Sequence, residues 1–173
     1  WDKDSNLIHS SFRGISQFTT DGCGNFYAIN SDNWIIKSEP DGAEKVIHEA
    51  EGWHSYLQSD PLGRLFYMNS DSIFTCGDGV EDRLILGGEK GYFDGPAKQA
   101  KFRSPSGSVV DSNGNLYIAD LESHTVRKLS TDGVVSTVAG MDGKSGDTDG
   151  PASAARFNSP SAVGATHDNF AVS

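Results

Sequence analysis

The sequence is poor in cysteine and has no long apolar run, and each shortage excludes a class of protein. Its 173 residues include two cysteines, Cys23 and Cys76, which are too few for a disulfide framework and lack the spacing of a zinc site. We expect two unpaired thiols, with a single bridge between them as the alternative. No apolar run approaches the roughly 20 residues that a helix needs to cross a bilayer, so we expect no membrane insertion.

Basic residues are scarce as well. Lys and Arg number 14 against 24 Asp and Glu, and the formal net charge of −10 is spread along the chain rather than gathered in a tail. Nucleic acids and anionic membranes both select for Lys and Arg, which neutralise their phosphates. We therefore expect no nucleic-acid partner and no attraction to an anionic membrane surface.

The sequence says little about the compartment. It has no signal peptide, but it begins at Trp1 rather than Met, so this absence does not locate the protein. The glycosylation motif Asn-x-Ser/Thr does not occur either. As an expectation, an extracellular or periplasmic location is favoured over a cytoplasmic one.

A duplicated segment is the most informative feature that is present. Residues 94–105 and 149–160, each twelve residues long, lie 55 residues apart and match at eight positions, which include the opening Asp-Gly-Pro-Ala. A period in this range indicates a repeat array or a β-propeller. Asp and Gly-Pro suit a turn, and the residues that follow suit a short helical turn. We expect Phe102 and Phe157 to fill the gaps between repeats, although the segment could instead be a ligand loop.

Short strands separated by tight turns surround this segment. Residues 108–111, 116–119, 125–130 and 134–139 are β-rich, and Asn113-Gly114 between the first two is a strong hairpin signal. The same order recurs in weaker form at 15–18, 26–29, 34–37 and 45–48, and at 55–58, 65–68, 72–75 and 83–86. A fourth unit begins with 161–166 and 170–173.

Such four-stranded sheets must bury their faces against one another. Consecutive strands with short hairpins favour an all-β propeller over a linear stack. We expect five segments: a strand that closes the last blade at 1–13, a first blade at 14–52, a second at 53–104, a third at 105–158 and half of a fourth at 159–173. The half-blade leaves an unpaired edge, so we expect the chain to be part of a larger propeller, or to close a ring with a second copy.

The third unit carries a recognisable set of motifs. After Asp-Gly-Pro-Ala come Gly-Asn-Leu-Tyr-Ile-Ala-Asp120, Ser123-His-Thr-Val-Arg-Lys-Leu129 and Val138-Ala-Gly140. Together they resemble the NHL-repeat β-propeller family, and His124 stands at the His of the Asn-His-Leu tripeptide that names it. The first and second units lack Asp-Gly-Pro-Ala and match mainly in order and spacing. The resemblance implies a complete propeller of about six blades that serves as an interaction module.

One end of the predicted blades is the candidate ligand face. It consists of the turns between second and third strands together with the connectors between blades. Its polar and aromatic residues are Asn30, Asp32, Asn33, Glu49, Glu51, Trp53, His54, Asn69, Asp71, Glu122 and His124. Exposed aromatics among carboxylates suit a partner with basic or polar groups, which points to a protein or peptide, or to a glycan. The alternative is a solvated acidic rim without a ligand.

Metal and acid–base chemistry have weaker support. Asp142, Asp147 and Asp149 lie in a Gly-rich loop and could bind calcium, but they do not match the EF-hand pattern. Because Asp120 and Arg127 belong to the repeat pattern, we expect Asp120 to cap a turn and Arg127 to pair across blades.

Two classes of function follow from these observations. The leading one is a binding or scaffold module with no cofactor. The alternative is part of a metal-dependent enzyme of the related six-bladed group, such as a lactonase-like hydrolase or an amidating-lyase-like protein. The residues that hint at this enzyme are Asp60, Asn69, Asp111 and His167.

Overall fold

The computed structural model describes residues 14–50, 56–60, 63–77, 80–165 and 170–173. The predicted closing strand at 1–13 and the candidates Glu51, Trp53, His54 and His167 lie outside these residues. The chain divides into two compact units, one of residues 1–67 with 75–83 and one of residues 68–74 with 84–173. No helix among the described residues combines the length and apolarity needed to cross a membrane.

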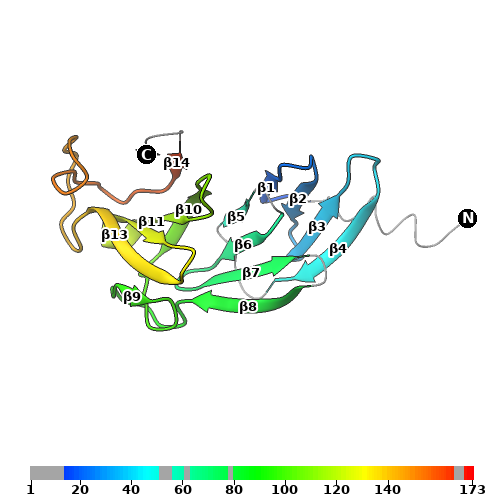
Figure 1. The fold of residues 1–173 in the computed structure, drawn as a ribbon, viewed down its shortest axis with the longest axis horizontal. Coiled ribbons are helices and arrows are strands. Elements are labelled where there is room, and N and C mark those ends of the chain that lie inside the picture. Colours follow the sequence, from blue (N-terminus) through cyan, green and yellow to red (C-terminus); the bar gives the residue numbers. More distant parts are fainter. Residues whose placement is uncertain (1–13, 51–55, 61–62, 78–79, 166–169) are drawn as a thin grey trace, which may run out of the picture. The chain divides into compact units, whose positions relative to one another are not determined.

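Two four-stranded antiparallel sheets are built by the first half of the chain. The first has the order β1-β2-β3-β4 and consists of β1 (Gln17–Thr20), β2 (Phe26–Ile29), β3 (Trp34–Ser38) and β4 (Glu44–Glu49) (Figure 1). The second has the order β5-β6-β7-β8 and consists of β5 (Tyr56–Ser59), β6 (Leu65–Met68), β7 (Ile73–Gly77) and β8 (Val80–Leu86). Both sheets follow the predicted order and spacing of strands.

The third sheet has one strand more than the sequence predicts. Its order is β10-β11-β12-β13-β9, with β10 (Pro105–Val110), β11 (Leu116–Asp120), β12 (Thr125–Leu129), β13 (Val134–Gly140) and β9 (Gly95–Pro96). The short strand β9 lies within the duplicated Asp-Gly-Pro-Ala segment and pairs with the outer edge of β13. A 3₁₀ turn, η1 (Leu121–Ser123), joins β11 to β12.

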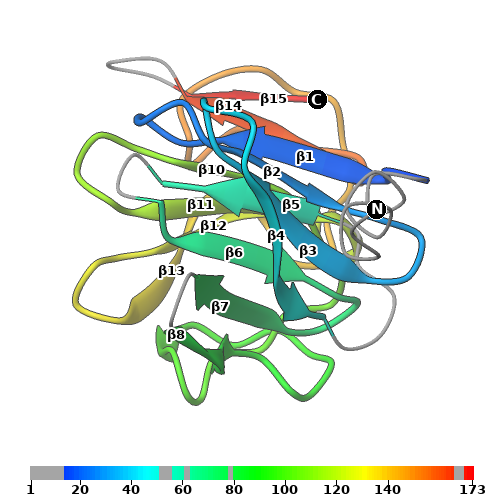
Figure 2. The same cartoon turned by 90° about the vertical axis from the view of Figure 1, so that its right-hand side faces the viewer.

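The fourth unit is a two-stranded sheet, β14 (Val163–Ala165) and β15 (Phe170–Val172), drawn in the red end of the colour scale in Figure 2. The all-β class and the antiparallel four-stranded sheets are therefore confirmed. Neither Cys23, which is exposed, nor Cys76, which is buried, forms a disulfide, as expected.

The turns between first and second strands are held by aspartates. Asp111 Oδ1 accepts hydrogen bonds from the backbone N–H groups of Asn113 and Asn115, both at 2.9 Å, and its Oδ2 accepts one from the Asn115 side chain at 2.8 Å. Burial by itself raises the pKa of Asp111, but these hydrogen bonds and one from Tyr117 hold the pKa below its ordinary value. Asp21 makes the equivalent contacts in the first sheet, with the same net effect on its pKa.

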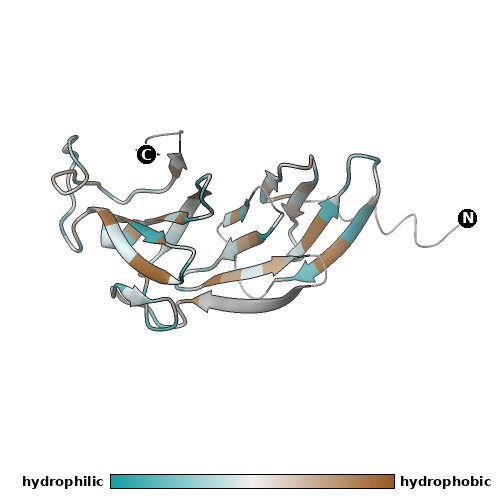
Figure 3. Cartoon of the chain, viewed as in Figure 1, coloured by the Kyte–Doolittle hydropathy of each residue, from teal (hydrophilic) through white to brown (hydrophobic). Residues whose placement is uncertain are grey.

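The two faces of the third sheet are buried in different ways. On one face, Val126 and Ala139 pack against Val163 of β14, with Phe157 at the edge of this cluster. This confirms the predicted role of Phe157 between neighbouring repeats. The other face carries a buried arginine, Arg127, beside apolar residues. Figure 3 shows hydrophobic colour in β13 and mainly hydrophilic colour in the loop after it.

First strands of successive sheets contact each other within each unit. In the first unit β1 contacts β5, and Ser59 Oγ donates to the Thr20 carbonyl at 2.7 Å. In the second unit β10 contacts β14, and a Cβ on Gly107 would lie 2.6 Å from the Ala162 Cα. Only glycine allows such a close approach of two backbones. Side-by-side first strands are the arrangement expected of propeller blades.

Candidate functional surface

Asparagine side chains build the turns between second and third strands. Asn30 is 1% exposed, and its Oδ1 accepts hydrogen bonds from the backbone N–H groups of Asp32 and Trp34 at 3.0 and 2.9 Å. Asn69 does the same in the second sheet, where Ser72 donates at 2.9 Å. Both residues belong to the predicted ligand face, which stays a prediction, and their amide oxygens accept hydrogen bonds within their own turns.

Asp120 occupies the equivalent position in the third sheet. It was predicted to cap the following turn, but its Oδ1 instead accepts hydrogen bonds from the backbone N–H groups of Arg103 and Ser104, at 3.0 and 2.9 Å. Its Oδ2 accepts one from Ser123 Oγ at 2.7 Å. Asp120 is fully buried and therefore anchors the connector that precedes the sheet.

His124 ends the 3₁₀ turn in the left-handed backbone region, with φ of 57°. Its Nδ1 accepts a hydrogen bond from the backbone N–H of Ser159 at 3.0 Å. An imidazole nitrogen can accept only when it carries no proton, so this contact fixes the proton on Nε2 in the neutral ring. His124 thus ties the third sheet to the connector that leads to β14.

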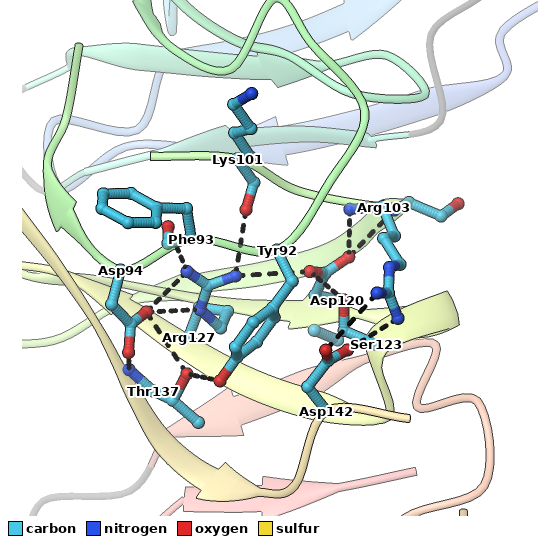
Figure 4. Close-up of polar contacts among 12 residues, drawn as sticks. Tyr92, Phe93, Asp94, Lys101, Arg103, Asp120, Ser123, Arg127, Thr137 and Asp142 are labelled. Carbon is cyan, nitrogen blue, oxygen red and sulfur yellow. Dashed lines mark hydrogen bonds and ion pairs between the residues drawn. The ribbon is translucent and has the colours of Figure 1, made fainter. Parts of the chain in front are cut away.

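Arg127 is the centre of a buried polar network (Figure 4). Its Nη2 and Nε donate to Asp94 Oδ1 at 2.6 and 3.0 Å, and its Nη1 lies 3.4 Å from Asp120 Oδ2. The carbonyls of Phe93 and Lys101 accept its remaining N–H groups at 2.9 and 3.2 Å. Arg127 was predicted to pair across blades, and its partner Asp94 lies in the connector just before β9, within the predicted second blade.

Aromatic rings enclose the same guanidinium. It lies 4.5 Å from the ring centroid of Tyr92 and 4.8 Å from that of Phe102, distances that give favourable cation–π contacts. Phe102, predicted to fill a gap between repeats, is fully buried beside Arg127. The network therefore fastens the connector of residues 87–104 to the third sheet and has a structural role.

Acidic residues recur two positions after each turn-building residue. Asp32 follows Asn30 and is exposed, and Asp71 follows Asn69 and accepts a hydrogen bond from Ser72 Oγ at 2.7 Å. Glu122 follows Asp120, is exposed, and pairs with Lys90 at 2.8 Å. Each of the three sheets thus presents one carboxylate at this end of its strands. We call Asp32, Asp71 and Glu122 the turn carboxylates.

The calcium candidates do not form a cluster. Asp142 pairs with the Arg103 guanidinium at 2.7 Å, while Asp147 and Asp149 are exposed farther along the loop. Nowhere in the described part of the chain do three or more His, Cys, Asp or Glu side chains gather in a way that could hold a metal ion.

The residues that hinted at an enzyme make local contacts where the structure describes them. Asp60 is 2% exposed and binds the backbone N–H and the Nε of Arg64 at 2.8 and 2.6 Å. Asp60 precedes β6 and Asn69 follows it, so the two stand at opposite ends of one strand. Asp111 holds its own turn in another sheet.

Comparisons with known proteins identify the repeat. The NHL repeat matches residues 102–129, which run from Phe102 to the end of β12. This chain contains an NHL repeat. It is also similar to NHL repeat-containing protein 2 of Gallus gallus, with 37% identity over 81 residues, which cover 46% of this chain and 11% of that protein.

Solved structures extend the likeness of this NHL-repeat chain to propellers. A protein of unknown function from Bacteroides thetaiotaomicron has 26% identity and a TM-score of 0.78 over 89% of this chain and 43% of its own. An auxiliary nutrient binding protein from the same organism has 21% identity and a TM-score of 0.70, over 86% and 42%. A virginiamycin B lyase from Staphylococcus aureus matches with 13% identity and a TM-score of 0.58. Because the identities of the lyase and of the nutrient binding protein are below 25%, these two matches show the fold alone. The chain spans less than half of each of these proteins.

Proposed function

We propose that the chain is part of a non-catalytic propeller module that binds basic proteins or peptides, and that the turn carboxylate of each sheet, taken by itself, contacts a basic group of the partner. The observation that carries this proposal is their recurrence. Three sheets of different sequence each keep an acidic residue two positions after the turn-building Asn or Asp. The three carboxylates differ in what they contact, since Asp71 accepts a hydrogen bond from Ser72 Oγ and Glu122 pairs with Lys90. The proposal therefore rests on their recurrence at one position and not on a shared contact.

The charge of the chain supports the same partner. A net charge of −10 attracts cationic partners and accelerates their association at low ionic strength. The described residues offer no cluster of side chains that favours the metal-dependent hydrolase, so we do not propose that activity.

A charge-neutralisation experiment tests this proposal. The double variant Asp32→Asn with Glu122→Gln removes two exposed carboxylates, and Asp41→Asn with Asp132→Asn is the matched control. Asp41 and Asp132 are equally exposed, but they lie in the turns between third and fourth strands, at the other end of each sheet. The probe is a fluorescein-labelled octalysine peptide, with octaglutamate as the negative probe, and fluorescence anisotropy measures binding.

We expect the Asp32/Glu122 variant to bind octalysine between about twofold and thirtyfold more weakly than the parent chain, as loss of two exposed charge contacts predicts. The control should change the affinity less than twofold. The weakening should shrink in 0.5 M salt, where screening is strong. Equal losses in both variants would assign the binding to net charge alone and refute a site at the turn carboxylates.

A further inference from the structure

Glu122, the turn carboxylate of the third sheet, already holds a cation. The Nζ of Lys90 lies 2.9 Å from Glu122 Oε1 and 2.8 Å from Oε2, so the ammonium bridges both oxygens. The two side chains are 57% and 47% exposed, so the pair lies at the surface, where a partner can reach it. Asp71 instead accepts a hydrogen bond from the Ser72 hydroxyl at 2.7 Å, and among the described residues neither Asp71 nor Asp32 forms an ion pair.

The backbone on both sides of Lys90 is fixed without the help of this ion pair. On one side, the Gly88 N–H donates to Ser72 Oγ at 2.9 Å. On the other side, the Gly91 N–H donates to the Phe102 carbonyl at 2.9 Å. These contacts hold the connector whether or not the ion pair forms. Separation of the pair therefore requires rotation of exposed side chains and no change in the fold.

The backbone that carries Glu122 is fixed as well. Glu122 lies in the 3₁₀ turn η1, where the N–H of Leu121 donates to the Ser104 carbonyl at 3.0 Å. The next residue, Ser123, is fully buried, and its Oγ donates to Asp120 Oδ2 at 2.7 Å. The turn thus presents an exposed carboxylate from a rigid base, and a preorganised group of this kind loses little conformational freedom when a partner binds.

An exposed pair between a lysine and a carboxylate is a weak contact, which typically changes an equilibrium by no more than about fivefold. A cation of the partner can therefore displace Lys90, but it has to compete with a lysine that is always present at the site. A lysine of the partner would exchange one ammonium for another, with no gain at the carboxylate. An arginine does gain, because its planar guanidinium can donate two parallel N–H bonds, one to each carboxylate oxygen.

We propose that Lys90 is an internal competitor for Glu122 and that the basic group of the partner that replaces it is an arginine. This role of Lys90 rests on the proposed function, because it concerns the partner group at one of the turn carboxylates. Both residues belong to the same compact unit, so the competition takes place within that unit. When the partner binds, its guanidinium takes both oxygens of Glu122, and the ammonium of Lys90 moves into water. Lys90 thus lowers the affinity for basic partners at this carboxylate, and least for arginine.

Substitutions of Lys90 test the competition in two directions. The probe is fluorescein-labelled octaarginine, and fluorescence anisotropy measures its binding to the full chain. Lys90→Met removes the competitor and should bind octaarginine about two- to fivefold more tightly than Lys98→Met. Lys98 is an exposed lysine of the same connector that forms no ion pair among the described residues, so both variants change the net charge equally. Lys90→Arg keeps the charge but supplies a stronger competitor, so it should bind octaarginine at least about twofold more weakly than the parent, whereas Lys98→Arg should not.

The variant Glu122→Gln shows whether the effect arises at this carboxylate. In a chain with Glu122→Gln, the further changes Lys90→Met and Lys98→Met should have equal effects on the affinity for octaarginine. The preference of the parent for octaarginine over octalysine should also shrink at least about twofold in this variant.

Failure of the proposal and failure of the proposed function give different results. If Glu122→Gln weakens binding but Lys90→Met binds octaarginine like Lys98→Met, the proposed function stands and the internal competitor is refuted. Binding by Lys90→Arg that is as tight as that of the parent would refute it too. If Glu122→Gln binds like Asp132→Asn, which removes an exposed carboxylate from another turn, or if no variant binds octaarginine, both the proposed function at this carboxylate and the competition are overturned.

Discussion

Arg127→Met is the sharpest test of the buried network. The guanidinium is fully buried, and Asp120 beside it is fully buried too, whereas the side chain of Asp94 is 41% exposed. Removal of one partner from a buried ion pair costs about 3–5 kcal/mol because the other charge remains without compensation. Met keeps an unbranched apolar chain next to Tyr92 and Phe102, so the change removes the charge and its hydrogen bonds more than the packing.

The hydrogen bonds that remain at Asp120 and the hydration of Asp94 place the expected loss of stability at the lower end of that range. Asp120 keeps its three hydrogen bonds from Arg103, Ser104 and Ser123, and Asp94 can be hydrated. We therefore expect Arg127→Met to lower the free energy of unfolding by about 3 kcal/mol. Since a domain has about 5–15 kcal/mol in total, the variant should still fold at 25 °C but melt at a clearly lower temperature.

The assay has to follow the unfolding of the second compact unit, which contains Arg127. Trp34 on β3 lies in the first compact unit and the network lies in the second, so the fluorescence of Trp34 does not follow the network directly. Urea unfolding followed by far-UV circular dichroism, with hydrogen exchange of residues 91–140, is the suitable assay. Arg103→Met is the control, because Arg103 and its partner Asp142 are 35% and 29% exposed and should contribute about 1 kcal/mol or less. A loss below about 1 kcal/mol for Arg127→Met would refute the argument.

Two further predictions concern single side chains. The pKa of Asp111 is lowered in the folded state, so its carboxylate stabilises the fold above the pKa of the unfolded state, and this contribution is lost as the pH falls through the folded pKa. The variant Asp111→Asn should therefore be less stable than the parent at pH 7, and the difference in stability should shrink toward pH 2. A difference in urea midpoints that stays constant with pH would contradict this prediction. Thr125 is fully buried, and its hydroxyl has no hydrogen-bond partner among the described residues. In the same assay, Thr125→Val should therefore match the stability of the parent or exceed it by up to about 1 kcal/mol. A loss of about 1 kcal/mol would show that the hydroxyl makes a hydrogen bond.

Turn chemistry explains why most of the fold could be predicted. Asn-Gly and Asp-Gly pairs mark hairpins because these residues tolerate positive φ, and in the structure Gly114 and Gly133 have φ of 83° and 82°. The apolar runs between such turns then become strands. The two-residue strand β9 was missed because Gly and Pro are poor strand formers. Pro lacks an N–H group and is tolerated at a sheet edge, which is where Pro96 lies.

The candidate ligand face was harder to predict because a polar residue near a turn has two uses. Asn30 and Asn69 are predicted members of the ligand face, and the structure shows a further use of both, since their amide oxygens accept hydrogen bonds from backbone N–H groups of their own turns. The signal for this was present, since Asn or Asp directly after a strand often forms such a turn. The pairing of Arg127 with Asp94 spans 33 residues, and no local pattern encodes a contact at that separation.

Differences between the sheets show what Arg127 requires. The residue at its position is Ile36 in the first sheet, where β4 carries the same irregularity opposite this point as β13 does opposite Arg127. In the second sheet Thr75 stands at the same distance from its turn asparagine. Neither sheet has an Asp-Gly-Pro connector before it, so among the residues whose burial is described the buried arginine occurs where the connector supplies a carboxylate. A buried guanidinium without that partner would be strongly unfavourable, so arginine and connector have to occur together.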